Sequence, residues 1–258
     1  MSVTHLNVAD HPIDDVSYRQ TCRLQLEADG ALVLRQFFTA DAIEQVVRES
    51  APFESEAFYA GSTHNVYLTD ADPDLPPGHA FNRQIASSKG LIADDQIGAV
   101  SPLRSVYDDS TFRSFIADLV GVTTIYPYAD ALSSINVHYA AEGMELGWHF
   151  DNSSFAITML LQAPEGGGTF EYVPAVRNAA TGDNAYDRVI NILDRHEAPM
   201  TLSFDPGDLV LFRGRDAIHR VTPTQGDATR MLVVFAFNDE PNVRLSDSAL
   251  TTFYGRTY

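Results

Sequence analysis

The chain is poor in cysteine, in tryptophan and in positive charge. Among 258 residues there is one cysteine, Cys22, so no disulfide can form within the chain. A reducing compartment suits such a sequence, and we expect a cytoplasmic location. Seventeen basic residues stand against 35 acidic ones, which gives a net charge of −18. Because a surface this acidic repels nucleic acid and anionic membranes, we expect neither as a partner.

Lysine and long apolar runs are also scarce. Lys89 is the only lysine, which we attribute to compositional bias and not to function. No apolar run approaches the ~18 residues that would indicate a membrane span. Residues 1–15 are polar and acidic and lack the basic and apolar regions of a signal peptide.

The overall composition is that of an ordinary globular protein, with 45% hydrophobic and 20% charged residues. We find no repeats and no linker, and therefore predict a single domain over residues 1–258. It would comprise an N-terminal helical and loop support to about residue 121, a barrel core over about 122–240 and a tail over 241–258.

The support region mixes several patterns. We expect a polar lead-in at 1–25, a strand at 31–37, a helix at 42–50, a loop-rich stretch at 51–100 and a helix at 101–121. The loop-rich stretch is either a substrate lid or a plain surface excursion.

From about residue 122 the apolar pattern changes to a period of two, which is typical of half-buried strands. The expected strands span 135–140, 145–151, 155–162, 168–173, 200–205, 208–213, 219–223 and 230–237. A polar insert at 177–197 interrupts them and contains one short helix. This pattern predicts a mainly β fold with flanking helices, built on a double-stranded β-helix of the jelly-roll or cupin type.

Two of the expected strands carry metal-ligand types. His149 and Asp151 are two residues apart, so strand alternation turns both side chains to one face, whereas Trp148 and Phe150 face the core. His219 follows in the seventh strand. Two imidazoles and one carboxylate make the facial triad of non-haem Fe(II) oxygenases, which leaves coordination positions open. Arg230 begins the eighth strand, and a guanidinium there suits the far carboxylate of a dicarboxylate co-substrate.

The blocks INVHYAAEGMELGWHFD at 135–151 and GDLVLFRGRDAIHRVTPTQGDATRMLVVFAF at 207–237 resemble the Fe(II)/2-oxoglutarate dioxygenase superfamily. More narrowly, four stretches resemble free-standing oxygenases of free amino acids, a group of radical halogenases and hydroxylases: GWHFD, GGGTFEYVPAVRN at 166–178, FRGRDAIHRVTP at 212–223 and FYGR at 253–256.

The resemblance implies Fe(II) as cofactor and 2-oxoglutarate and O2 as co-substrates. It implies His149, Asp151 and His219 as iron ligands and Arg230 as the anchor of 2-oxoglutarate. Asn136 and His138, on one face of the first barrel strand, would contact the co-substrate, although His138 is equally well read as a core histidine. Arg213 and Thr222 remain alternative donors.

Related halogenases carry a small residue at the position of Asp151, which frees a site for chloride. Asp151 therefore favours hydroxylation of a small molecule, which the resemblance implies to be a free amino acid or a derivative. The candidate substrate contacts are Asn152, Asn238, Tyr254 and Arg256. The last two would close the pocket if the tail folds back; otherwise they belong to an ordinary capping tail.

Three other functions remain open. The same oxidative chemistry can end in desaturation or ring closure. A cupin-like sensor would bind a metal without turnover, but it needs no anchor such as Arg230. A nucleic-acid demethylase conflicts with the charge of −18. The oligomeric state is not predicted.

Overall fold

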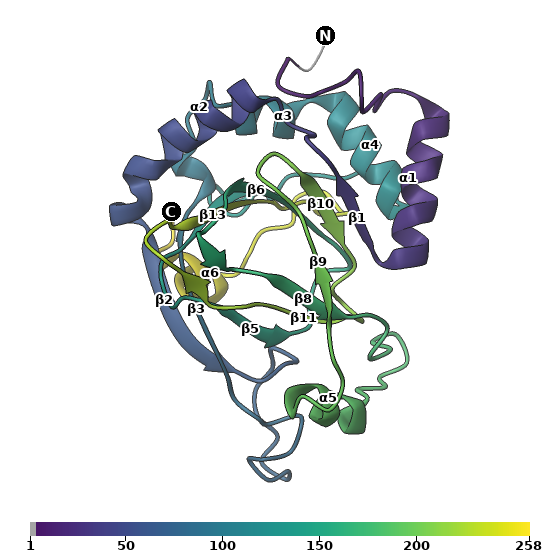
Figure 1. The fold of residues 1–258 in the computed structure, drawn as a ribbon, viewed down its shortest axis with the longest axis vertical. Coiled ribbons are helices and arrows are strands. Elements are labelled where there is room, and N and C mark those ends of the chain that lie inside the picture. Colours follow the sequence, from purple (N-terminus) through teal and green to yellow (C-terminus); the bar gives the residue numbers. More distant parts are fainter. Residues whose placement is uncertain (1–3) are drawn as a thin grey trace.

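The computed structural model describes residues 4–258, and its centre is an antiparallel sheet that curls on itself (Figure 1). The helices are α1 (Val16–Asp29), α2 (Ala40–Ser50), α3 (Pro102–Asp108), α4 (Ser110–Val120), α5 (Tyr186–Leu193) and α6 (Asp247–Tyr254), with 3-10 turns η1 (Ala51–Glu56) and η2 (Asp94–Gln96). The strands are β1 (Ala31–Leu34), β2 (Phe58–His64), β3 (Ile85–Ile92), β4 (Ile135–Ala140), β5 (Leu146–His149), β6 (Ala156–Gln162), β7 (Gly166–Gly167), β8 (Phe170–Val173), β9 (Met200–Leu202), β10 (Leu209–Phe212), β11 (Ile218–Val221), β12 (Thr224–Gln225) and β13 (Arg230–Phe235).

The sheet has two halves joined by one strand. Its order is β1-β10-β6-β13-β4-β3-β5-β11-β8-β9, with β2 paired to the side of β3. Strand β3 makes the junction, because it pairs with β4 at Gly90↔Tyr139 and with β5 at Ser87↔Leu146. The predicted jelly-roll barrel is therefore confirmed, and the two halves enclose an interior between them.

Strand alternation decides what each face of the first half does. On β13, Met231, Val233 and Phe235 belong to the main hydrophobic core, which they share with helices α1 to α4. Arg230 and Leu232 point to the opposite face and line the barrel interior. Figure 1 shows these helices along one side of the barrel, so they support one wall of the interior.

A second core supports the other half. Trp148 and Phe150 on and after β5 pack with Val189, Ile192 and Leu193 of α5. The expectation that the two aromatic side chains face the core agrees with this packing. The predicted short helix in the polar insert is present as α5, and its role is to cover this second core.

The N-terminal support differs from its prediction in two places. The lead-in at 1–25 contains most of α1, which begins at the cap Asp15 and ends at Gly30 in the left-handed conformation. The predicted helix at 101–121 is two helices. Asp109 separates them, because its side chain accepts the backbone N–H groups of Thr111 and Phe112 and so starts α4.

The loop-rich reading of 51–100 is wrong for much of that stretch. Strands β2 and β3 pair along their whole length, from Phe58↔Leu91 to His64↔Ile85. A Cβ at Gly90 would lie 2.6 Å from the Tyr59 ring, so the glycine lets this ring lie close over β3. The pair forms a wall of the barrel interior.

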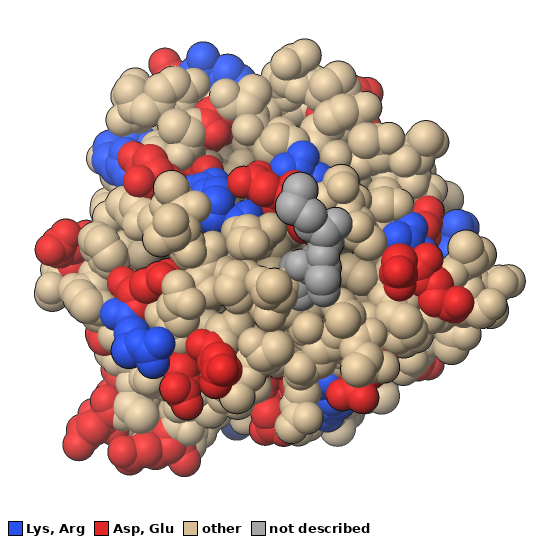
Figure 2. All heavy atoms as spheres, turned by 90° about the horizontal axis from the view of Figure 1, so that it is seen from above, with Lys and Arg blue, Asp and Glu red and all other residues tan. Residues whose placement is uncertain are grey.

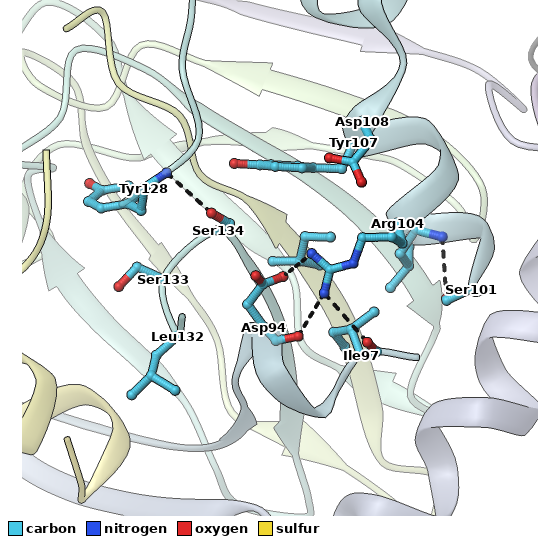
Figure 3. A network of polar contacts seen from close by, with 12 residues as sticks. Asp94, Ile97, Ser101, Arg104, Tyr107, Asp108, Tyr128, Leu132, Ser133 and Ser134 are labelled. Carbon is cyan, nitrogen blue, oxygen red and sulfur yellow. Dashed lines mark hydrogen bonds and ion pairs between the residues drawn. The ribbon is translucent and has the colours of Figure 1, made fainter. Parts of the chain in front are cut away.

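The end of β3 is fastened to α3 (Figure 3). Arg104 of α3 makes an ion pair of 2.8 Å with the Asp94 carboxylate, and its guanidinium also donates to the Asp94 carbonyl at 2.8 Å. Tyr107, on the same helix, donates to the carbonyl of Ala236 just after β13 at 2.7 Å. These contacts attach the C-terminal end of β3 to α3, which belongs to the main core.

The surface view agrees with the acidic composition. On the face in Figure 2 acidic side chains gather in several clusters, and most basic ones lie beside them instead of forming a continuous basic stripe. No helix in the part of the chain that the structure describes is long and apolar enough to cross a membrane.

Candidate active site

A cavity of about 1210 Å³ occupies the barrel interior. Strands from both halves line it, and so do β2, β3 and α6. The wall is largely apolar, with few charged groups. This combination of an apolar lining and a few convergent polar groups is typical of small-molecule sites.

His149 and His219 face each other across the strand pair β5–β11. They are direct partners in the strand register, and their ring centroids are 4.2 Å apart. The register shifts between His219 and Val221, so the pairing is irregular just beyond the histidines. Two strands that start far apart in the sequence thus place both imidazoles side by side in the cavity.

Backbone carbonyls fix the orientation of both rings. The Nδ1 of His149 lies 2.8 Å from the Gly147 carbonyl, and the Nδ1 of His219 lies 3.0 Å from the Ala217 carbonyl. Because a carbonyl can only accept, each Nδ1 carries the hydrogen, and each Nε2 keeps its lone pair for another partner. Metal-binding histidines are commonly oriented in this way.

Asp151 completes the group just beyond the end of β5. Its Oδ1 lies 3.8 Å from the Nε2 of His149 and 3.5 Å from the Nε2 of His219. Its Oδ2 is buried without a hydrogen-bond partner within residues 4–258. The backbone N–H of Asp151 donates to the carbonyl of Gly214 at 3.0 Å, which turns the chain so that the carboxylate faces the histidines.

The donor set fits a divalent metal ion. One ligand atom from each of His149, Asp151 and His219 lies within 4.8 Å of the others. Burial, then His219, lower the pKa of His149 to about 3, so this imidazole is neutral. Burial alone would raise the pKa of Asp151, but His219, His149 and Lys89 hold it below its ordinary value. A neutral His149, a second imidazole that offers its Nε2 and an ionised carboxylate with one oxygen lacking a partner within residues 4–258 fit the donor set that a metal requires.

A hydrogen-bond chain from the β2–β3 pair supports His149. The Ser87 hydroxyl oxygen accepts from the Gly147 N–H at 2.9 Å, and the hydroxyl lies 2.7 Å from His64 Nε2. His64 Nδ1 lies 3.0 Å from the Asn65 carbonyl and therefore donates to it. Since the Gly147 carbonyl orients His149, Ser87 and His64 fix that imidazole through the backbone between them.

Arg230 offers a second charged group in the same cavity, a guanidinium without a partner among the described residues. It is 6% exposed, and its guanidinium makes no hydrogen bond or ion pair with any described residue. Burial lowers its pKa to about 10, so it remains charged at neutral pH. Gly168 makes room for it, because a Cβ there would lie 2.8 Å from the Arg230 Cδ. A buried guanidinium in this state is ready to take a carboxylate.

His138 lines the same cavity and stands opposite Leu232 in the strand register. Burial, then the charges of Lys89 and Arg230, lower its pKa well below the ordinary value, so the ring is neutral. Of the two readings left open for His138, its position favours the cavity contact.

The remaining predicted contacts lie elsewhere. Asn136 does not line the cavity: its amide donates to the carbonyls of Leu132 and Ile135, and its oxygen accepts from Tyr254 at 3.0 Å. Arg256 forms a two-bonded ion pair with Asp95 at 2.7 and 2.9 Å. The tail does fold back, but Thr252 and Phe253 line the cavity instead of these two residues.

The other candidates are also outside the lining. Asn152 is exposed, and its carbonyl accepts from Arg215 at 3.2 Å. Asn238 pairs with Tyr126 in an isolated bridge. Arg213 has a buried Nε without a partner among the described residues, and the Thr222 hydroxyl accepts from the Thr169 N–H at 3.0 Å.

Sequence reasoning missed most polar residues of the cavity wall, among them His64, Ser87 and Lys89. All three lie in the stretch that was read as loop. The one available signal was that Lys89 is the only lysine of the chain.

The curled sheet, the group of His149, Asp151 and His219 and the unpaired side chain of Arg230 together indicate the class of protein. Solved structures with the same fold include a 2OG-Fe(II) oxygenase family oxidoreductase from Burkholderia pseudomallei, with 12% identity, a TM-score of 0.52 and coverage of 88% of this chain and 93% of that one. A prolyl hydroxylase from Trichoplax adhaerens in complex with a hypoxia inducible factor peptide has 11% identity, a TM-score of 0.56 and coverage of 91% and 95%. EctD from S. alaskensis, with 2-oxoglutarate and 5-hydroxyectoine, has 15% identity, a TM-score of 0.52 and coverage of 84% and 74%.

The chain is an Fe(II)- and 2-oxoglutarate-dependent oxygenase. The model of the Halogenase D family matches residues 86–252, so the chain belongs to that family. No curated protein matches the sequence.

Proposed function

We propose that the protein hydroxylates an unactivated C–H bond of a small molecule, a free amino acid or a derivative of one. In this proposal His149, Asp151 and His219 hold the Fe(II), and residues 1–258 act as one oxygenase domain in the cytoplasm. The observation that carries it is the arrangement of two Nε2 atoms and one carboxylate oxygen within 4.8 Å, at the wall of a cavity that also contains Arg230.

Each residue has a separate task. When bound, Fe(II) together with 2-oxoglutarate and O2 supplies the oxidising power to replace a C–H hydrogen by hydroxyl, with succinate and carbon dioxide as by-products. Arg230 binds the far carboxylate of 2-oxoglutarate through two parallel hydrogen bonds. The Arg230 charge is one of those that lower the pKa of His138, so the two side chains lie near each other. The neutral His138 contacts 2-oxoglutarate between the two carboxylates of that molecule. The apolar walls exclude water and orient the substrate.

Asp151 is the reason to propose hydroxylation in a family described as halogenases. A carboxylate ligand occupies the coordination position that a halide would need. Halogenation is the second candidate, and the family description favours it. Desaturation or ring closure would use the same residues and would differ only in how the substrate is held.

A panel of free amino acids and small metabolites tests the proposal. Purified protein with Fe(II), 2-oxoglutarate and O2 should release succinate above its background with at least one compound, and mass spectrometry should find a product heavier by one oxygen atom. A product lighter by two hydrogens would indicate desaturation, and one in which chlorine replaces hydrogen would indicate halogenation. Absence of substrate-stimulated succinate release with every amino acid in the panel would refute the amino-acid assignment.

A further inference from the structure

Lys89 places a second unpaired cation in the active-site cavity. It lies on β3, and its side chain lines the cavity together with those of Ser87 and Leu91, its neighbours on the same face of the strand. The other face of β3 is covered at Gly90 by the ring of Tyr59. The only lysine of the chain therefore points to the interior, where the metal ligands also lie.

The ammonium of Lys89 has no partner within residues 4–258. It makes no hydrogen bond and no ion pair there, whereas most arginines of the chain are paired with acidic side chains. Burial lowers its pKa to about 8, and the charge of Asp151 opposes that shift. An unpaired charge in a mostly apolar cavity destabilises the fold, so its presence indicates a ligand that pairs with it.

The charges of the loaded site leave room for one more anion. The two positive charges of Fe(II) balance the two negative charges of 2-oxoglutarate. Asp151 balances one of the two cavity cations, Lys89 and Arg230. Among residues 4–258, the only other acidic residue that lines the cavity is Asp70, which is exposed to solvent. One positive charge therefore remains without a partner.

Strand order puts Lys89 between the strand that carries His149 and the strand that carries Arg230. In the sheet, β3 is the direct neighbour of β5, which carries His149, while β4 separates β3 from β13, which carries Arg230. In the proposed function both ends of 2-oxoglutarate already have partners, so a further anion that meets Lys89 belongs to the substrate.

We propose that Lys89 binds a carboxylate of the substrate and thereby selects carboxylate-bearing small molecules over their neutral counterparts. This inference rests on the proposed function and adds a specificity-determining residue to it. The substrate's carbon chain then extends from Lys89 along apolar wall residues such as Leu146 and Phe170, which lie near the metal ligands.

The single lysine provides a direct spectroscopic test. Reductive methylation with ¹³C-formaldehyde keeps the positive charge and labels only Lys89 and the terminal amine. The Lys89→Arg variant identifies the Lys89 signal, which it lacks. With Zn(II) in place of Fe(II), no turnover is needed. We titrate 2-oxoglutarate first, and then each common amino acid beside its primary amide, which lacks the carboxylate.

At least one amino acid should shift the Lys89 signal saturably, and its amide should bind about tenfold more weakly or worse. Calorimetry should show the same loss of affinity for that amino acid in Lys89→Met, which keeps the length of the side chain but not its charge. Lys89→Arg should retain most of the affinity. Ser88→Ala, an uncharged change in the same wall, should bind like the wild type, and 2-oxoglutarate affinity should be unchanged in Lys89→Met.

Four results would overturn the inference: equal binding of acid and amide, no shift with any amino acid, weaker 2-oxoglutarate binding in Lys89→Met, or a saturable shift with chloride alone. The third would make Lys89 a co-substrate anchor, and the fourth would make it a halide site. The proposed function has its own test, because it fails if no compound stimulates succinate release. The two failures are therefore distinguishable.

Discussion

Gly214 and Asp151 lie so close together that no other residue type fits at position 214. A Cβ on Gly214 would overlap the Asp151 Oδ2, and it would lie 2.8 Å from the Cε1 of His219. The carbonyl of Gly214 meanwhile accepts the Asp151 N–H at 3.0 Å. The loop between β10 and β11 therefore positions the carboxylate by a backbone bond and by the absence of a side chain.

Gly214→Ala should displace the Asp151 carboxylate and weaken Fe(II) binding by about 10- to 100-fold, the range seen when groups that support metal ligands are changed. Metal analysis after dialysis against graded Fe(II) measures this. The control is Gly61→Ala on β2, where a Cβ meets nothing within 4 Å. Wild-type iron affinity in Gly214→Ala would show that Asp151 does not need its present position to bind metal.

His219→Ala should abolish both stoichiometric Fe(II) binding and 2-oxoglutarate turnover, because one of three proposed ligands is lost. Iron content and succinate release are the measurements. His196→Ala removes an exposed histidine after α5 and should keep both properties. If His219→Ala turns over at the wild-type rate, the metal is held elsewhere.

Arg230→Ala should weaken 2-oxoglutarate binding by about 2–4 kcal/mol, the scale of a lost desolvated charge pair. Arg230→Lys should recover only part of it, because a lysine cannot make two parallel hydrogen bonds. Calorimetry under nitrogen measures the affinity. Arg213→Ala is the comparison: a loss there, with Arg230→Ala unchanged, would move the anchor to Arg213.

How far the sequence predicted this site depends on the range of the contacts involved. His149 and Asp151 were placed correctly on one face because strand alternation is a local property. The meeting of His149 with His219 follows from the order of strands in a jelly roll, which the eight alternating segments indicated. Trp148 and Phe150 face the core for the same local reason.

The misplacements come from long-range packing. Asn136 is expected in the cavity, but Tyr254 of α6, more than a hundred residues later, donates its hydroxyl to the Asn136 side chain, which lies outside the cavity lining. Strands β2 and β3 were missed because Gly61, Ser87 and Ser88 weaken their pattern, and only pairing with each other and with β4 makes them strands. The attribution of Lys89 to compositional bias overlooks its position, because nothing local in the sequence shows that its strand lines a cavity.

Lys89→Met should stabilise the ligand-free protein at pH 7. Burial lowers the pKa of Lys89 from 10.5 to about 8, so the folded state binds its proton less well than the unfolded state. The charge therefore destabilises the fold fully below pH 8, and the penalty fades as pH rises from 8 towards 10.5. The gain in Tm, about 2–4 °C per kcal/mol for a chain of this size, should shrink over that range. A gain that is equal at pH 7 and pH 10 would point to packing instead of charge.

The wild-type protein should hydroxylate and should not chlorinate, even with chloride in excess. The reason is Asp151, whose Oδ1 lies 3.5 Å from the Nε2 of His219 and which would fill the coordination position a halide needs. Mass spectrometry of the product with the best substrate of the amino-acid panel measures the ratio of the two outcomes.

Asp151→Gly should lose most hydroxylation, because iron affinity falls when a ligand is missing. It should gain at most trace chlorination, since a halide also needs its own pocket and a substrate carbon held away from the hydroxyl. Asp151→Asn, which keeps the shape but not the charge, separates loss of iron affinity from opening of the position. Clear chlorination by the unmutated protein would overturn both the role of Asp151 and the hydroxylase assignment.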